Sequence, residues 1–175
     1  MSEDLKFHLD KISEYIQNAK DGLPLDVFYF VSQLTPLINV DLLIKNKQGQ
    51  VLLAWRDDRF YGPAWHIPGG IIRFKEKIED RIQKVSLLEL GATVNFAPEP
   101  IHIRGLINQE RDIRGHFISL LFLCELSSDL AQEKEYKGGD PKQGEWAWHD
   151  KAPCNLLKVH EAFRKYIDET PPLSV

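Results

Sequence analysis

Cysteine is scarce in this chain of 175 residues, which contains only Cys124 and Cys154. Their separation does not match the spacing of metal-binding cysteine pairs. We therefore expect two reduced, partly buried thiols in a cytoplasmic protein, and a structural disulfide is the alternative interpretation.

Long apolar runs and a large excess of one charge are absent as well. No stretch is long and apolar enough to cross a bilayer as a helix, and residues 1–6 lack the apolar run of a secretory signal. The net charge of −4 provides no large basic field, so bulk binding to nucleic acid is not favoured. We expect a cytoplasmic protein whose partners are neither membranes nor nucleic acids.

The remaining composition is that of an ordinary globular protein. Apolar residues make up 43% and charged residues 27% of the chain, which are common proportions for a folded domain. A length of 175 residues suits one domain with a substantial core and hardly two.

The spacing of apolar residues predicts strands interleaved with helices. Apolar residues recur every three or four positions between Leu5 and Ile16, which predicts an amphipathic helix over residues 4–19. Gly22 is expected to stop it, and Pro24 suits the first turn of a short second helix. Strands are predicted at 37–44, 51–55, 65–67, 101–107, 116–126 and 145–149, and further helices at 76–90 and 156–167.

This order of elements predicts the α/β class, with a mixed sheet between helical layers. We divide the chain into a helical extension, residues 1–34, and a main domain, residues 35–170. The apolar face of the first helix would pack either on its own domain or on a second subunit.

The stretch from Gly70 to Gly91 resembles the Nudix box. In that motif a glycine is followed by five residues, a glutamate, seven residues, Arg-Glu, an apolar residue, any residue, two glutamates, any residue and a glycine. Gly70, Glu76, Glu89 and Gly91 fall in register. The motif marks enzymes that hydrolyse nucleoside diphosphates linked to another group. The resemblance implies their α/β/α sandwich fold with a mixed sheet.

Three charged positions of the motif are changed. Lys84 stands in place of the arginine, and Val85 and Leu88 replace two metal-binding acids. In the family the first glutamate, here Glu76, is structural and pairs with the arginine. Lysine lacks the fork geometry of arginine, so we expect a weaker pair between Glu76 and Lys84.

One helix carboxylate, Glu89, remains as a metal ligand in this comparison. The resemblance implies that Glu89 holds one Mg²⁺, with Mn²⁺ as an alternative ion, and that the carbonyl of Gly69 or Gly70 is a second ligand. The alternative is that Glu89 only emerges from the core and forms an ordinary ion pair.

The same two missing acids are found in the GDP-mannose mannosyl hydrolase branch, which this chain resembles over residues 35–92. Thr35-Pro36-Leu37 with the later Asp41, the strand ending in Arg56, and residues 61–70 match segments of that branch. There, water attacks the anomeric carbon of the sugar, and one Mg²⁺ stabilises the leaving GDP. The resemblance implies a nucleotide-sugar substrate and a homodimer, with Asp41 holding a sugar hydroxyl or tuning the site and Arg56 binding the diphosphate.

The remaining site residues are less directly matched. Arg73 would replace the branch arginine, whose position is Ile71 here, and Gln143 would be a metal ligand. The branch has a histidine as general base, but no histidine stands at its position. Glu145 is therefore our candidate base, and His66 is expected to contact the ligand. Glu110 and His116 are alternative bases.

Two other functions stay open from the sequence. The missing acids and histidine suit a degenerate Nudix domain that binds a nucleotide without catalysis. Attack on phosphorus, as in ADP-ribose or nucleotide pyrophosphatases, is the third possibility, and the products of the reaction would distinguish it from attack on carbon.

Overall fold

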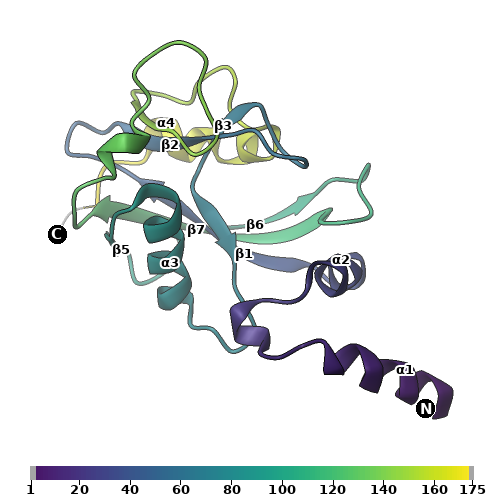
Figure 1. The fold of residues 1–175 in the computed structure, drawn as a ribbon. Coiled ribbons are helices and arrows are strands. Elements are labelled where there is room, and N and C mark those ends of the chain that lie inside the picture. Colours follow the sequence, from purple (N-terminus) through teal and green to yellow (C-terminus); the bar gives the residue numbers. More distant parts are fainter. Residues whose placement is uncertain (1–2, 174–175) are drawn as a thin grey trace.

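The computed structural model describes residues 3–173 and confirms the α/β class (Figure 1). A five-stranded sheet has the order β4-β1-β7-β5, and β6 also pairs with β7. A three-stranded sheet has the order β3-β2-β8. The strands are β1 (Leu37–Ile44), β2 (Val51–Arg56), β3 (Ala64–His66), β4 (Gly69–Ile71), β5 (Val94–Phe96), β6 (His102–Ile107), β7 (His116–Leu126) and β8 (Trp146–His149).

The larger sheet is mixed, as predicted. Strands β1 and β7 run parallel over eight residue pairs, from Leu37 opposite Phe117 to Ile44 opposite Cys124. The pairs of β1 with β4, and of β7 with β5 and β6, are antiparallel. Both central strands are therefore flanked on each side, and the short β4 forms one edge of the sheet.

Two apolar cores lie on opposite sides of the strands. Along β1, Val40 and Leu42 join the core beneath α3 (Ile78–Leu90), whereas Leu43 joins a second core. This second core contains Phe163 from η3 (Lys158–Phe163) and residues of α4 (Arg164–Glu169). Side chains alternate along a strand. Asp41 therefore faces the same side as Leu43, towards η3, and away from the apolar core under α3.

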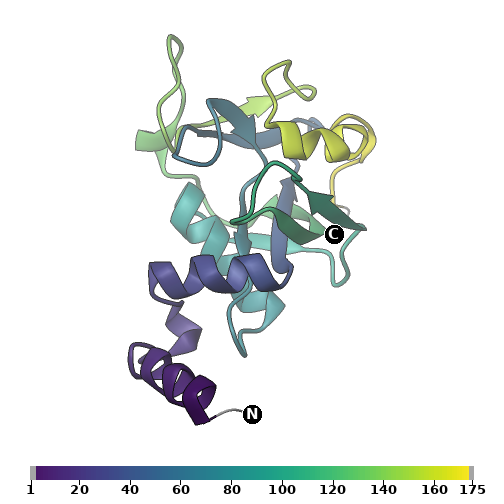
Figure 2. The ribbon, with the colours of Figure 1, turned by 90° about the vertical axis from the view of Figure 1, so that its right-hand side faces the viewer.

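The N-terminal extension has two unlike helices. Helix α2 (Leu25–Leu34) packs against the main body, where Tyr29 contacts Phe60 with ring centroids 5.8 Å apart. Helix α1 (Glu3–Glu14) has no buried residue and projects away from the strands in both views (Figures 1 and 2). Leu9 and Ile12, on the apolar face of this helix, are exposed.

Several predicted boundaries are corrected by the structure. The first helix ends at Glu14 rather than at residue 19, and a short 3₁₀ turn, η1 (Ala19–Asp21), follows. Asn18 caps that turn by accepting the Lys20 N–H, which gives the backbone a local alternative to helix. The last predicted helix divides into η3 and α4. Helix α3 does end at Gly91, whose φ of 68° is left-handed as expected.

Two strands were not predicted. Strands β4 and β5 have three residues each, and β4 begins with two glycines. Such short segments show no period of their own, and their pairing is determined by β1 and β7. The two cysteines are free thiols, with Cys124 buried and Cys154 exposed.

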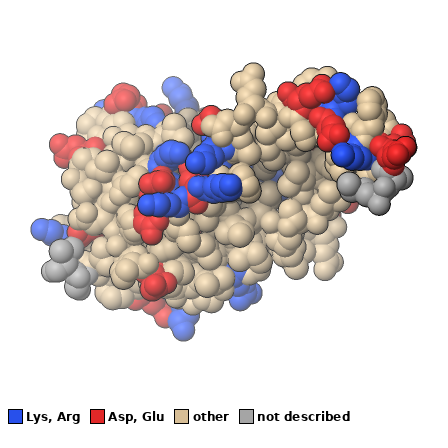
Figure 3. All heavy atoms as spheres, turned by 90° about the horizontal axis from the view of Figure 1, so that it is seen from below, with Lys and Arg blue, Asp and Glu red and all other residues tan. Residues whose placement is uncertain are grey.

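None of the helices among residues 3–173 has both the length and the apolar character needed to span a membrane. On the face seen in Figure 3, basic and acidic side chains are intermixed, and large areas are uncharged. This face shows no extended area of a single sign.

Candidate active site

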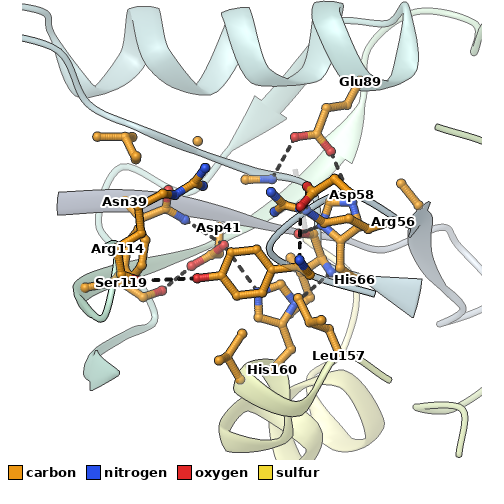
Figure 4. Close-up of a pocket in the computed structure, with 18 of the residues that line it drawn as sticks. Asn39, Asp41, Arg56, Asp58, His66, Glu89, Arg114, Ser119, Leu157 and His160 are labelled. Atoms are coloured by element: carbon orange, nitrogen blue, oxygen red, sulfur yellow. Dashed lines mark hydrogen bonds and ion pairs between the residues drawn. The ribbon is translucent and has the colours of Figure 1, made fainter. Parts of the chain in front are cut away.

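A cavity of about 380 Å³ lies between the edge of the large sheet, the end of α3 and η3 (Figure 4). This volume suits a small organic ligand. Segments far apart in the sequence contribute polar side chains to its lining: Asn39, Asp41, Arg56, Asp58, His66, Glu89, Arg114, Ser119, Lys134, Gln143 and His160.

Asp41 is the most deeply buried acid of the cavity. Asn39 Nδ2 donates to its Oδ1 at 2.9 Å, and the Ser119 hydroxyl donates to its Oδ2. Burial raises the pKa of Asp41 to about 6, while these hydrogen bonds and the positive charge of Arg56 partly oppose the increase. At neutral pH the carboxylate is therefore mostly ionised, with a pKa suited to accepting a proton.

Glu89 lies in the last turn of α3 and points into the cavity from the opposite side (Figure 4). The Gly69 N–H donates to its Oε1 at 3.3 Å. Its side chain keeps 28% of its surface exposed, yet burial raises the pKa of Glu89 to about 7. Lys134 Nζ donates to the carbonyls of Leu88 and Glu89 at the end of the helix, and its positive charge partly opposes the increase in the pKa of Glu89.

The register of β4 against β1 distinguishes Gly69 from Gly70. The Leu42 N–H donates to the Pro68 carbonyl, and the Ile72 N–H donates to the Ile38 carbonyl. Hydrogen-bonded and non-hydrogen-bonded pairs alternate in an antiparallel ladder. The pair of Gly69 with Asp41 is therefore of the non-bonded kind, and the backbone groups of Gly69 face away from β1 and towards Glu89.

Side chains at these two glycines would collide with their surroundings. A Cβ at Gly69 would lie 2.3 Å from Asp41 Oδ1, and one at Gly70 would lie 2.7 Å from Val85 Cγ2. Both distances are too short for real contacts. The glycines therefore allow the backbone to lie against the Asp41 carboxylate on one side and helix α3 on the other.

The Ile67 peptide group fixes the tautomers of two buried histidines. The Ile67 N–H donates to His160 Nδ1 at 3.0 Å, so the proton of neutral His160 is on Nε2, which lies 3.8 Å from Asp41 Oδ1. His66 Nδ1 donates to the Ile67 carbonyl at 2.9 Å, so its Nε2 carries a lone pair, 3.6 Å from Glu89 Oε2. Burial lowers the pKa of His66 to about 4, and it lowers that of His160 as well.

Two arginines supply positive charge to the cavity. Arg56 Nε donates to Asp58 Oδ2 at 2.6 Å, and its guanidinium lies 4.6 Å from the Tyr61 ring centre. Arg114 Nε is buried and has no hydrogen-bond partner within the described chain. The backbone of Arg114 is left-handed, with φ of 55°, and its N–H donates to Ser32 Oγ in α2 at 3.1 Å. The extension therefore helps to hold this arginine in place.

The comparison with known proteins now identifies the family. A model of the NUDIX domain matches residues 35–169. The chain belongs to the NUDIX family. Its members are hydrolases that act on nucleoside diphosphate-linked substrates.

Two relatives are similar to this chain over part of their length. The chain is 33% identical over 74 residues to the low-salt glycan biosynthesis protein Agl8 of Haloferax volcanii, covering 42% of this chain and 47% of Agl8. It is 26% identical over 110 residues to an ADP-ribose pyrophosphatase of Methanocaldococcus jannaschii, covering 59% of this chain and 62% of that protein. The matches therefore span about half to three fifths of these relatives.

Solved NUDIX structures share the fold. A NUDIX hydrolase from Clostridium perfringens superposes with a TM-score of 0.56 and 16% identity, covering 77% of this chain and 95% of that one. A MutT protein from Methanosarcina mazei Go1 superposes with a TM-score of 0.54 and 21% identity, covering 77% of this chain and 94% of that one. At these identities the similarity concerns the fold alone.

Glu76 of the NUDIX box is an anchor outside the cavity. Lys84 Nζ donates to its Oε1 at 2.9 Å, and Arg81 Nε donates to its Oε2 at 2.8 Å. The backbone N–H of Arg73 also donates to Oε2. These donors hold the pKa of Glu76 at about 2 despite burial. The predicted pair of Glu76 with Lys84 is present, and the buried Arg81, which was not predicted, supplies the guanidinium that position 84 lacks.

The structure brings together only some of the predicted site residues. Asp41, Arg56, His66, Gly69, Gly70, Glu89 and Gln143 line the cavity. Arg73 does not, because its guanidinium donates to the Asp21 carbonyl in the extension. Glu145 is also absent from the lining, and its Oε2 accepts the Lys142 N–H at 2.9 Å. Gln143 Oε1 accepts the Asp57 N–H at 2.6 Å, so the oxygen proposed for a metal already has a partner.

Sequence reasoning missed six of these polar residues, among them Asp58 and Lys134. Asn39, Arg114, Ser119 and His160 lie in segments that were assigned only as strand, loop or helix. Their sequence context carries no motif, and they meet only because β1, β7 and η3 converge. The alternative bases Glu110 and His116 do not line the cavity.

A single cation fits the donors that are present. No group of three His, Cys, Asp or Glu side chains suited to a metal occurs within residues 3–173. Glu89 and the Gly69 backbone nevertheless face the same part of the cavity. A divalent ion that uses one carboxylate, a main-chain carbonyl and substrate oxygens is common chemistry for Mg²⁺.

Proposed function

We propose that this protein hydrolyses a nucleoside diphosphate sugar by attack of water on the anomeric carbon, with one divalent cation at Glu89. The observation that carries the proposal is the acid content of α3. Val85 is buried in the core and Leu88 is apolar, so Glu89 is the only carboxylate of α3 that lines the cavity. One carboxylate suits one ion, and one ion suffices to offset charge on a leaving diphosphate.

The two arginines support binding of that diphosphate. Arg56 and Arg114 both line the cavity, and the buried Arg114 Nε lacks a partner among the described residues. A buried donor without a partner costs free energy, roughly 1–3 kcal/mol, which an anionic ligand would recover. Arginine is suited to this task because its planar fork matches phosphate oxygens.

Asp41 is the base in this proposal, in place of Glu145. Asp41 lines the cavity with a pKa of about 6, and Ser119 and Asn39 fix its orientation. The water oxygen bonds to the anomeric carbon, and its proton passes to Asp41. The bond from that carbon to the diphosphate oxygen breaks, and its electron pair leaves with the diphosphate. When bound, the divalent ion offsets the charge that develops on this leaving group.

Product analysis tests the site of attack. Purified protein would be incubated with Mg²⁺, ¹⁸O-labelled water and a panel of GDP- and ADP-linked sugars. We expect a nucleoside diphosphate and a free sugar that carries the label. Asp41→Asn should lower turnover by about 10²–10⁴-fold, the range for a lost general base, and Glu145→Gln should leave turnover unchanged. Turnover by Asp41→Asn equal to that of the unaltered protein would remove Asp41 from the mechanism.

Attack on phosphorus is the second candidate, and the similarity to an ADP-ribose pyrophosphatase favours it. In that case the products would be a nucleoside monophosphate and a sugar phosphate, with the label in a phosphate group. Binding of a nucleotide sugar without any turnover would support the third possibility, a NUDIX domain that binds but does not catalyse.

We also propose that the protein is a cytoplasmic homodimer, and α1 supports a second copy as partner. Leu9 and Ile12 of its apolar face are 43% and 37% exposed, and the helix has no buried residue. Isolated helices of about 12 residues are marginal in water, so a covered face would stabilise it. Light scattering should report twice the chain mass, and Leu9→Asp should shift the protein towards the mass of one chain. A single-chain mass at micromolar concentration would contradict the dimer.

A further inference from the structure

The hydrogen bonding of His66 leaves one ring nitrogen available. Its Nδ1 donates to the Ile67 carbonyl at 2.9 Å. A carbonyl oxygen only accepts, so the proton of the neutral ring is on Nδ1 and the Nε2 lone pair points elsewhere. Metal-bound histidines have the same arrangement, in which the other ring N–H donates to a backbone carbonyl or carboxylate.

The available nitrogen faces the Glu89 carboxylate. His66 Nε2 lies 3.6 Å from Glu89 Oε2, and both side chains line the cavity. Two acceptors repel each other unless a positive group lies between them. Metal–nitrogen and metal–oxygen bonds are each about 2.0–2.2 Å long for a first-row ion, so 3.6 Å is a suitable separation for two atoms that share one ion.

The Gly69 backbone borders the same place. Its N–H donates to Glu89 Oε1, and the strand register directs its carbonyl away from β1 as well. A nitrogen, a carboxylate oxygen and a main-chain oxygen therefore surround one corner of the cavity. His160 does not compete for this role, because its Nδ1 accepts the Ile67 N–H.

We propose that His66 Nε2 is a direct ligand of the divalent cation at Glu89, so that the site prefers a first-row transition ion such as Mn²⁺ or Co²⁺ to Mg²⁺. Mg²⁺ prefers oxygen ligands, whereas imidazole suits transition ions. The inference rests on the proposed function only in placing the cation at Glu89. Of the two ions that the sequence resemblance implies, it favours Mn²⁺ over Mg²⁺.

Metal titration of the full chain without substrate tests the inference. Calorimetry and the visible absorption of Co²⁺ would give the affinities of the unaltered protein, His66→Gln and Glu89→Gln for Mg²⁺, Mn²⁺ and Co²⁺. We expect His66→Gln to weaken Mn²⁺ and Co²⁺ by at least about 10-fold, the loss that even outer-shell partners of a metal site cause. Mg²⁺ affinity should change much less. Glu89→Gln should weaken all three ions.

His102→Gln is the matched control, because His102 stacks on Tyr166 and does not line the cavity. It should bind every ion as the unaltered protein does. Electron spin-echo spectroscopy of Mn²⁺ on the unaltered protein should show coupling to an imidazole ¹⁴N. That measurement decides the question even where a variant does not fold.

The outcomes separate this inference from the proposed function. Equal Mn²⁺ and Co²⁺ affinities for His66→Gln and the unaltered protein, with loss only in Glu89→Gln, would overturn the role of His66 and keep the cation at Glu89. Unchanged affinities in both variants would overturn the Glu89 site itself. Absence of ¹⁴N coupling, or stronger binding of Mg²⁺ than of Mn²⁺, would also overturn the inference.

Discussion

Glu76 and Glu89 belong to the same motif and have opposite surroundings. Glu76 accepts hydrogen bonds from Arg81 and Lys84, and its pKa is about 2. Glu89 faces a histidine lone pair and the Gly69 N–H, and its pKa is about 7. The protein thus supplies two cations as direct partners of Glu76, whereas among residues 3–173 Arg56 and Lys134 act on Glu89 only through their charge, without an ion pair at its carboxylate. Glu76 anchors the box, and in our proposal Glu89 holds a cation from outside.

Replacement of Glu89 should have the largest effect on activity. Glu89→Gln is expected to lower turnover by about 100-fold or more, because a metal ligand contributes several kcal/mol to stabilising the transition state. Kinetics at saturating metal and substrate would measure this. A Glu89→Gln variant with at least half the normal turnover would show that the two glutamates do not differ in the way proposed.

Replacement of Glu76 should have the largest effect on stability. Glu76→Gln is expected to lower the free energy of unfolding at pH 7 by about 2–3 kcal/mol, because Arg81 would lose its charged partner in a buried site. Turnover per folded molecule should fall by less than about tenfold. Urea unfolding measures the loss, and Glu79→Gln, an exposed acid of the same helix, is the control. A loss equal to that of Glu79→Gln would contradict the anchor role.

The pH dependence of stability should separate the two acids further. The folded pKa of Glu89, about 7, exceeds its ordinary value of 4.5, so ionisation destabilises the fold as pH rises through this range. The free energy of unfolding of Glu89→Gln, measured in EDTA, should therefore rise relative to that of the unaltered protein as the pH increases from 5 to 8. The expected change in this difference is roughly 1–3 kcal/mol. The raised pKa of Asp41 also destabilises the fold as pH rises, both in the unaltered protein and in Glu89→Gln. The ionised Glu76 carboxylate stabilises the fold fully above pH 4.5, and this stabilisation is lost only as the pH falls towards 2.

Urea midpoints at pH 5 and pH 8 would show this difference. A constant gap between the unaltered protein and Glu89→Gln across this range would mean that the carboxyl titrates normally in the folded state.

The smallest expected effect concerns the two cations of the anchor. The Lys84 side chain is 55% exposed and that of Arg81 is 7% exposed. Lys84→Met should cost less than about 1 kcal/mol, as exposed ion pairs do. Arg81→Met should cost about 3 kcal/mol or more. Thermal or urea unfolding measures the loss of stability in each variant. Equal losses would show that Lys84 and Arg81 stabilise the Glu76 carboxylate to the same extent.

The elements that were predicted correctly have strong local patterns. Helix α3 combines apolar periodicity with a left-handed glycine at its end, and β1 and β7 are long and apolar. The NUDIX assignment followed from four residues in register and is confirmed by the family match. Strand β4 and the split between η3 and α4 were missed, because their form depends on neighbours across the sheet and not on local periodicity.

Predictions for the site were least secure where they relied on alignment to a distant position. Arg73 was assigned because it lies two positions after the aligned arginine position, and Glu145 because it lies beside a loop that could reach the site. The side chains of both residues have backbone partners outside the cavity. Their roles stay predictions that the activity tests address. Arg114 was missed because its position depends on a contact with Ser32, 82 residues earlier in the chain.

The sequence by itself determined the family, the long elements and the identity of the retained box glutamate, because each depends on residue spacing within one segment. Only the tertiary structure decided which atoms face one another. The Ile67 peptide sets opposite tautomers on His66 and His160, and the β4 register turns the Gly69 backbone towards Glu89. Proton positions and ligand directions depend on hydrogen bonds between distant segments, and those bonds exist only after the sheets and helices pack.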